Sequence, residues 1–326
     1  MAEIVLGIGA SHAPMGSTPP GLWPRIAEMD RCGRTLWVPD GRVCSYEELL
    51  EQADPGIITQ LEPNVCQARY DACQRALAQL ARVIESTPLD LLIVLGDDQD
   101  ELFHQDLMPA LTVYWGESVR KAPAGEMIES IGVPEAAWAY GLEERVYPVA
   151  SREAEVLIGS LCGQGFDVAQ LRCLPDGQGI GHAFSFVQTR LLEGRPLATI
   201  PVMLNTYYPP NQPTPRRCYE LSVGIHEAVR AIAPELKVGV VASGGLSHFV
   251  IDQELDHELL AALQARDGGR LSNLPAARLN SGSSEIRNWI GIAGAVEHLD
   301  MTLVDYQPCY RSAAGTGCAM GFAYWR

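Results

Sequence analysis

The chain contains four short apolar runs that each stop at polar or small side chains: residues 4–10, 91–95, 197–204 and 238–242. A mostly apolar run of this length is typical of a strand that is buried on both faces of a sheet. In an α/β sheet, strand ends that face the same edge converge on one crevice, where ligands bind. We therefore expect the polar residues that follow these runs to build a single site.

Between the strands, apolar residues recur every three or four positions, which predicts amphipathic helices. The expected helices cover residues 46–52, 62–86, 151–162, 217–232 and 252–265, and another starts at residue 185. Strands are expected at residues 89–95, 110–115, 166–171, 197–204 and 237–242, in addition to the first one. This alternation predicts an α/β fold, a single large domain over residues 1–326 with a central, mostly parallel mixed sheet covered by helices on both faces. The segment of residues 14–60 is longer than a connecting loop normally is, so we expect it to be an insertion or lid over one side of the crevice.

Composition excludes several classes of protein. With 326 residues, 47% of them hydrophobic, the chain has the material for a large core, and its net charge of −16 argues against a nucleic-acid partner. No apolar stretch approaches the roughly 20 residues that span a membrane. The start of the chain lacks a basic segment and is predicted to be a strand, not a signal peptide. The nine cysteines include no C-x-x-C pair, which favours reduced thiols and a cytoplasmic location.

Three of the seven histidines lie beside small residues that let the backbone approach a ligand closely. His12 follows Ser11, His182 lies in the turn Gly-Ile-Gly-His-Ala-Phe, and His248 ends the segment Ser-Gly-Gly-Leu-Ser-His. Each could be functional or could simply satisfy an internal hydrogen bond. The other four histidines are expected at surfaces or helix interfaces: His104, His226, His257 and His298. Because His104 lies in an extended segment, it stays a weak candidate for the site.

A metal site of the facial-triad type needs two imidazoles and one carboxylate. The candidate carboxylate is Glu285, which precedes a nearly all-apolar segment that we expect to be a buried helix capped by Ser283 or Ser284. A glutamate in the first turn of a helix can also serve only to complement the helix dipole. Spacing alone leaves both interpretations open.

Taken together, Ser-His12-Ala-Pro, Ser-Gly-Gly-Leu-Ser-His248 and Ser-Ser-Glu285-Ile-Arg-Asn-Trp resemble the class III extradiol ring-cleavage dioxygenases, most closely the β-subunit type of protocatechuate 4,5-dioxygenase. His182 fits the family's Asp-His-Gly turn, except that Gly181 replaces the aspartate. The resemblance covers the first strand and residues from about 88 to 322, and it is much weaker over 14–60.

The resemblance implies roles for these residues. His12 and Glu285 would be metal ligands, His248 the acid–base histidine beside the substrate, and His182 a second active-site histidine that hydrogen-bonds the substrate or its oxygen adduct. The family's other ligand histidine falls on Gln99, whose carbonyl is a weaker and harder donor than imidazole. Asp97 or Asp98 could reach the metal instead, or these acidic residues could form a solvated turn with Asp100.

The resemblance therefore implies an extradiol dioxygenase that uses Fe²⁺, or Mn²⁺ or another divalent ion, to cleave a catechol-like dihydroxy- or aminohydroxy-aromatic ring with O₂. Arg216, Arg217 or Arg287 could neutralise a substrate carboxylate. We expect a dimer or a pairing with a homologous subunit, and no membrane partner. Two alternatives stay open: a metal-free, non-catalytic homologous subunit or binding protein, and a hydrolase that uses a hard divalent ion at the same place.

Overall fold

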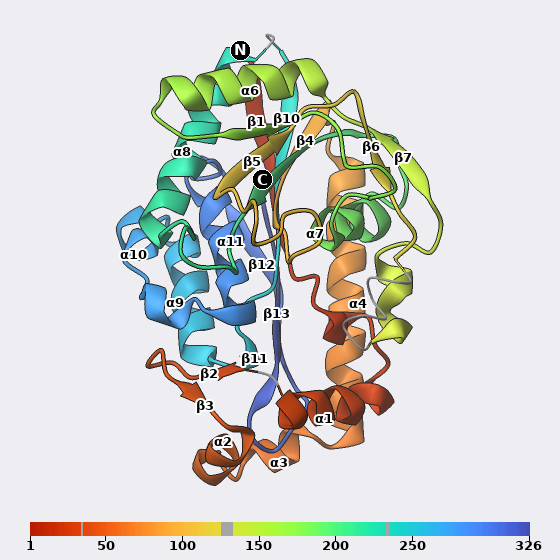
Figure 1. Ribbon diagram of the computed structural model, residues 1–326, viewed down its shortest axis with the longest axis vertical. Coiled ribbons are helices and arrows are strands. Elements are labelled where there is room, and N and C mark those ends of the chain that lie inside the picture. The colour runs from red at the N-terminus through yellow and green to blue at the C-terminus, as the bar shows by residue number, and fades with distance from the viewer. Residues whose placement is uncertain (34, 125–132, 233–234) are drawn as a thin grey trace.

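A computed structural model describes residues 1–33, 35–124, 133–232 and 235–326, and a mixed nine-stranded sheet forms its centre (Figure 1). Four strands at the middle of the sheet run parallel: β1 (Glu3–Ala10), β10 (Lys237–Ser243), β4 (Leu91–Asp97) and β9 (Ala198–Leu204). Their carboxyl ends therefore lie at one edge, as the apolar runs predicted. β4 extends beyond the predicted end at residue 95, so Asp97 belongs to the strand.

Antiparallel strands complete the sheet on both sides. β13 (Thr316–Trp325) pairs with β1, with β12 (Met301–Tyr310) and with β11 (His248–Val250). On the other side, β5 (Leu111–Tyr114) is antiparallel to β9 and parallel to β8 (Ala169–Leu171). The long β12–β13 hairpin was not predicted, because β13 is rich in Gly and Ala, which have low strand propensity, and its apolar pattern is weak.

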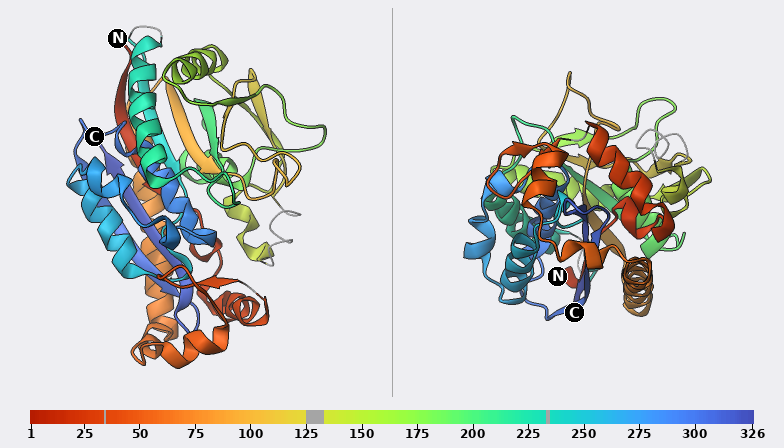
Figure 2. Two further views of the ribbon diagram at one scale, coloured as in Figure 1. Left: turned by 60° about the vertical axis from the view of Figure 1, so that its left-hand side comes forward. Right: turned by 90° about the horizontal axis from the view of Figure 1, so that it is seen from below.

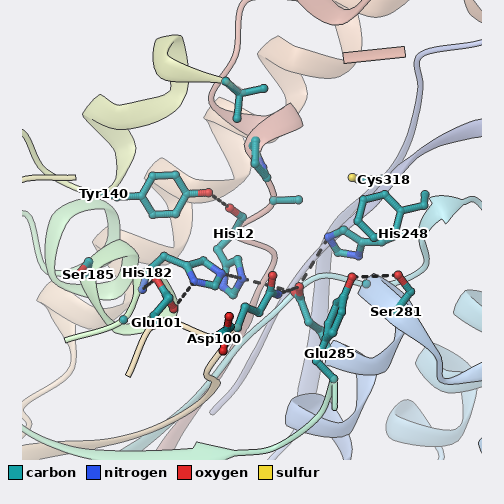
Figure 3. Close-up of a pocket in the computed structure, with 18 of the residues that line it drawn as sticks. His12, Asp100, Glu101, Tyr140, His182, Ser185, His248, Ser281, Glu285 and Cys318 are labelled. Carbon is teal, nitrogen blue, oxygen red and sulfur yellow. Dashed lines mark hydrogen bonds and ion pairs between the residues drawn. The ribbon is translucent and has the colours of Figure 1, made fainter. Parts of the chain in front are cut away.

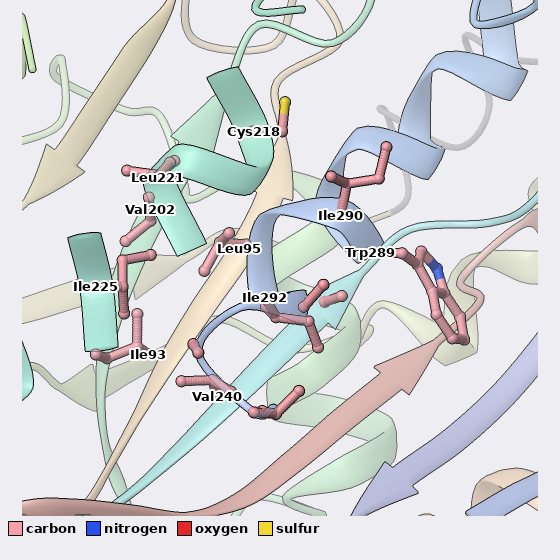
Figure 4. Packing of buried hydrophobic residues seen from close by; sticks show 14 of the residues in the cluster. Ile93, Leu95, Val202, Cys218, Leu221, Ile225, Val240, Trp289, Ile290 and Ile292 are labelled. Carbon is pink, nitrogen blue, oxygen red and sulfur yellow. The ribbon is translucent and has the colours of Figure 1, made fainter. Parts of the chain in front are cut away.

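Helices cover both faces of the sheet, which confirms the predicted fold class (Figure 1). Figure 4 shows the packing of one of the two apolar clusters between the sheet and its helices. Along β4, Ile93 and Leu95 pack in one apolar cluster while Leu92 and Val94 pack in the other, because successive side chains point to opposite faces. The first cluster involves α6 (Ser151–Gly163), α8 (Pro215–Ala231), α9 (Gln253–Gln264), α10 (Gly268–Ser272) and α11 (Ile286–Ala293). The second involves α1 (Trp23–Gly33), α4 (Pro63–Ser86), α7 (His182–Phe186) and a π-helix (Val187–Leu191).

Two predicted boundaries need correction near the site. His182 is the first residue of α7, with Gly181 before it, so it lies on a helix and not in a turn that precedes a helix at residue 185. The segment 281–285 is a 3-10 helix (Ser281–Glu285) that leads into α11, and neither Ser283 nor Ser284 caps it. Ser283 Oγ instead accepts the backbone N–H of His248, and Ser284 Oγ donates to Thr206 Oγ1.

The 14–60 segment forms α1, β2 (Leu36–Trp37), β3 (Val43–Cys44), α2 (Tyr46–Gln52) and α3 (Ile57–Gln60) at one end of the molecule (Figures 1 and 2). The predicted α2 begins with a capping box between Ser45 and Glu48. α1 was not predicted. It is tied to the C-terminal hairpin by Arg311, which donates two hydrogen bonds to buried Asp30 at 2.6 and 2.8 Å.

The remaining elements are short. β6 (Ser118–Lys121) and β7 (Arg145–Pro148) form a separate antiparallel pair, and further 3-10 helices cover Pro14–Gly16, Pro20–Leu22, Pro134–Ala139 and Ala276–Arg278. Across the described ranges, none of the helices has the length and apolar character needed to cross a membrane. The nine cysteines form no disulfide bonds with one another in the described ranges.

Candidate functional site

A cavity of about 1250 Å³ opens at the carboxyl edge of the parallel strands. Its lining brings together all five residues that the sequence suggested: His12, Gln99, His182, His248 and Glu285. Figure 3 shows the three histidines and Glu285 close to one another in the lining of this cavity. Residues of the 14–60 segment, among them Met15, Ile26 and Trp37, also line the cavity.

His12 follows β1 and is only 2% exposed. Ser243 Oγ donates to the carbonyl of Ala183 at 2.7 Å, so the contact of 3.0 Å between His12 Nδ1 and Ser243 Oγ is one in which the imidazole donates. Burial lowers the pKa of His12 to about 3, despite the opposing effect of Glu285. His12 is therefore neutral, and its Nε2 presents a lone pair to the cavity.

His182 forms an ion pair with Glu101, a residue that the sequence analysis missed. The ring Nδ1 lies 2.8 Å from Glu101 Oε2, and the backbone N–H of His182 donates to Oε1 at 2.9 Å. Burial alone would lower the pKa of His182, but Glu101 outweighs it and raises the pKa to about 10. With Nδ1 engaged, Nε2–H donates to His12 Nε2 at 3.1 Å.

Glu101 occupies the space that a side chain at position 181 would need. A Cβ on Gly181 would lie 2.7 Å from Glu101 Oε2. The motif that this turn resembles has an aspartate directly before the histidine, whereas here the carboxylate that contacts the ring belongs to a residue 81 positions earlier in the chain. No local sequence signal links Glu101 to His182, and only the fold brings the two together.

Glu285 is buried between three site residues. Its Oε2 accepts the backbone N–H of Gly245 at 2.5 Å and lies 3.4 Å from His12 Nε2 and 4.0 Å from His248 Nε2. Burial raises the pKa of Glu285, but the neighbouring His248 and His12 and the Gly245 N–H outweigh burial and lower it. Glu285 is therefore an ionised carboxylate aimed at the histidines, and its place at a helix start is not its main role.

His248 owes its position to the turn that precedes it. Its Nδ1 donates to the carbonyl of Leu246 at 2.7 Å, which leaves Nε2 facing Glu285. A Cβ on Gly245 would lie 1.8 Å from His248 Cε1, so only glycine leaves room for the ring. Burial lowers the pKa of His248, yet Cys318, Glu285 and the Leu246 carbonyl together raise it to about 10.

The acidic turn after β4 divides into two parts. Asp98 accepts the backbone N–H groups of Leu102 and Phe103 at 3.0 and 3.1 Å, so it stabilises the turn. Asp97 is fully buried next to His12 and Glu285, and burial, reinforced by Glu285, raises its pKa to about 7. The interpretation of a solvated acidic turn is therefore wrong for Asp97 and Asp98.

Gln99 joins the two buried carboxylates. Its Nε2 donates to Asp97 Oδ2 at 2.8 Å and to Glu285 Oε1 at 3.0 Å. Among the described residues, the donor atoms that could hold a metal ion come from His12, Asp97 and Glu285, and they all lie within 4.8 Å of one another. The histidines and carboxylates can thus bind a divalent cation and exchange protons with a ligand in the cavity.

The three arginines suggested for a substrate carboxylate do not line this cavity, so that prediction is wrong. Arg287 is buried and donates to the backbone carbonyls of Pro213, Thr206 and Leu279. Arg216 and Arg217 pair with Glu220 on the exposed side of α8.

The remaining histidines lie elsewhere, as expected. His104 is half exposed and pairs with Asp100. His298 donates to the carbonyl of Ile4, and its ring contacts that of His226. His257 packs against Tyr306.

Comparison with known proteins agrees with this geometry. Residues 183–316 match the family described as the catalytic LigB subunit of aromatic ring-opening dioxygenase. A gallate dioxygenase of Pseudomonas putida (strain KT2440) is 34% identical over 94 residues, which are 28% of this chain. The matched segment spans only 26% of that relative's length.

The family match contains His248 and Glu285 and begins directly after His182, whereas His12, Asp97 and Gln99 lie outside it. The resemblance to class III extradiol dioxygenases that the sequence motifs indicated is confirmed by this match. Residues 183–316 are therefore similar to the catalytic LigB subunits of aromatic ring-opening dioxygenases.

Proposed function

We propose that this protein is a non-haem, metal-dependent extradiol dioxygenase. It would use O₂ to cleave the ring of a catechol-like substrate next to its two hydroxyl groups, or next to a hydroxyl and an amino group. The observation that carries the proposal is the convergence of His12, His182, His248 and Glu285 in the lining of a single cavity. The two comparisons support it, one with the catalytic subunit of an aromatic ring-opening dioxygenase and one with a gallate dioxygenase.

The donor set fits a divalent metal ion, because a lone pair of neutral His12 and the carboxylate of Glu285 face each other at 3.4 Å beside Asp97. His12 and Glu285 would hold the ion, and either Gln99 or Asp97 would complete the set. When bound, Fe²⁺ or Mn²⁺ supplies Lewis acidity toward the substrate hydroxyls and an electron path to O₂. Everything else in the reaction falls to the side chains around it.

His248 is the residue placed to move a substrate proton. Its Nδ1–H is held by the Leu246 carbonyl, so Nε2 is the only ring atom free to exchange a proton with a hydroxyl in the cavity. This fixed orientation matches the acid–base role that the resemblance implies. General acid–base groups of this kind contribute about 10²- to 10⁴-fold in rate.

His182 acts as a hydrogen-bond donor. Glu101 holds its Nδ1 and keeps the ring protonated, so Nε2–H points toward His12 and the centre of the site. A charged donor there stabilises negative charge that develops on the oxygen atoms of the reacting ligand. Glu101 is a positioning residue, since it acts through His182.

The chief alternative is a metal-free, non-catalytic homologue that keeps the fold. Against it stands the burial of Asp97 and Glu285 beside each other, since two neighbouring buried carboxylates destabilise a fold unless they share a proton or bind a cation. This arrangement favours a protein that binds a cation at the site.

The test combines metal loading with oxygen uptake. Protein purified without oxygen is loaded with Fe²⁺ or with Mn²⁺ and mixed with catechols, gallates and aminophenols, while oxygen consumption and the absorbance of ring-opened products are followed. His12→Ala should abolish metal binding and ring cleavage. His104→Ala is the matched control, because that histidine is half exposed and lies outside the cavity lining. Absence of ring cleavage with every substrate and either ion would leave the non-catalytic alternative.

A further inference from the structure

We infer that the third metal ligand of this site is Asp97, so that the ion is held by one imidazole and two carboxylates and is of the hard, Mn²⁺-like class. The inference rests on the proposed function only in taking the site to bind a divalent metal. The carrying observation is that donor atoms of His12, Asp97 and Glu285, all buried, lie within 4.8 Å of one another.

Gln99 faces the cluster with the wrong atom for a ligand. Its two partners, Asp97 Oδ2 and Glu285 Oε1, are carboxylate oxygens that accept hydrogen bonds, so the amide must turn its NH₂ group toward them. The amide oxygen, which is the only atom of the side chain able to bind a cation, then points away from both carboxylates. Gln99 therefore orients the two carboxylates through hydrogen bonds and does not bind the ion itself.

The three proposed ligands are each oriented by a further hydrogen bond, as metal ligands usually are. Ser243 Oγ accepts from His12 Nδ1 at 3.0 Å and leaves Nε2 for the ion. Asn288 Nδ2 donates to Asp97 Oδ1 at 3.2 Å, and the Gly245 N–H donates to Glu285 Oε2 at 2.5 Å. Binding through His12 Nε2 requires the His182 ring to give up its hydrogen bond to that atom.

Charge and donor type decide which ion the site prefers. One neutral imidazole and two carboxylates carry a formal charge of −2, which a divalent cation balances, whereas a set with Gln99 would carry −1. Carboxylate oxygens suit Mn²⁺ and Mg²⁺, and imidazole favours Fe²⁺ and later transition metals. Replacing an imidazole by a carboxylate therefore shifts the preference toward Mn²⁺.

Metal binding itself is the measurement. Chelator-treated full-length protein is titrated with Mn²⁺, and loss of the free-ion signal in electron paramagnetic resonance gives the affinity and stoichiometry. Wild type should bind one Mn²⁺ per chain. Asp97→Asn, which keeps the shape and removes the charge, should weaken binding by more than about 100-fold, because outer partners of a metal ligand already account for about 10- to 100-fold.

Two variants make the result specific. Gln99→Ala removes only a hydrogen-bond partner of the ligands, so its loss of Mn²⁺ affinity should be at least about 10-fold smaller than the loss in Asp97→Asn. Asp106→Asn is the control: it removes an exposed carboxylate from the segment between β4 and β5 and should leave the Mn²⁺ affinity unchanged. Pulsed electron paramagnetic resonance of the Mn²⁺-bound protein should show a single coordinated imidazole nitrogen. If Gln99→Ala is the more damaging variant, or if two imidazoles coordinate, the assignment of Asp97 is wrong.

The outcomes separate this inference from the proposed function. If Mn²⁺ binds through Asp97 and no aromatic ring is opened, the ligand assignment stands and the dioxygenase proposal fails. If Asp97→Asn binds metal and opens rings as wild type does, the dioxygenase proposal stands and the ligand assignment fails. Circular dichroism of each variant checks that a lost affinity is not a lost fold.

Discussion

Asp256 offers a quantitative test of how the His248 turn is held in place. This fully buried carboxyl group on α9 accepts the N–H and Oγ–H of Ser247 at 2.8 and 2.7 Å and the hydroxyl of Tyr306 at 2.8 Å. Burial outweighs these three hydrogen bonds and raises the pKa of Asp256 to about 6. Ser247, the neighbour of His248, is thus held by hydrogen bonds to a carboxyl group whose ionisation costs free energy in the folded protein.

The sign of the pH effect follows from linkage. In the unfolded chain an Asp has a pKa of about 3.9, so the native state holds its proton more tightly and loses stability as the pH rises from about 4 through about 6. Asp256→Asn cannot ionise and keeps nearly the same shape. Relative to wild type, the variant should therefore gain about 1.4 kcal/mol of unfolding free energy between about pH 5 and about pH 8.

Urea denaturation of both proteins at the two pH values measures this difference directly, because each free energy comes from the same extrapolation. Asp176→Asn, at an exposed carboxylate, is the control and should show no pH-dependent difference from wild type. If the stability difference between wild type and Asp256→Asn is the same at both pH values, or moves in favour of wild type as the pH rises, the reasoning about this carboxyl group is refuted.

Two further predictions concern the histidines of the site. Glu101→Gln exchanges a charged partner of His182 for a neutral one, so the pKa of His182 in the metal-free protein should fall from about 10 by about one unit or more, and ring cleavage should slow at least about 10-fold. Nitrogen NMR of the histidines follows the pKa, and an unchanged value would contradict the ion pair. Gly282→Ala places a Cβ at 2.3 Å from His248 Cβ and should cost about 1–3 kcal/mol of stability and impair turnover. Gly21→Ala, which meets nothing within 4 Å, is its control, and equal effects in denaturation and turnover assays would show that crowding at His248 is not the cause.

Much of the architecture could be read from local patterns. The buried strands and the longer helices follow from apolar runs and from three- and four-residue spacing, because burial on a regular backbone imposes those periods. The same patterns placed His12 and His248 after strands that share an edge. The β12–β13 hairpin escaped prediction, since its Gly- and Ala-rich strand is stabilised by the neighbouring strands more than by its own residues.

The site shows the same division. Ordered motifs in the sequence alone resembled those of ring-opening dioxygenases and marked position 99 as the departure from the expected ligands. They could not show that Glu101 lies against Gly181 and pairs with His182, or that Gln99 turns its nitrogen to Asp97 and Glu285. These contacts join residues up to 186 positions apart, so they depend on distances and side-chain directions that exist only after the sheet and its helices have packed.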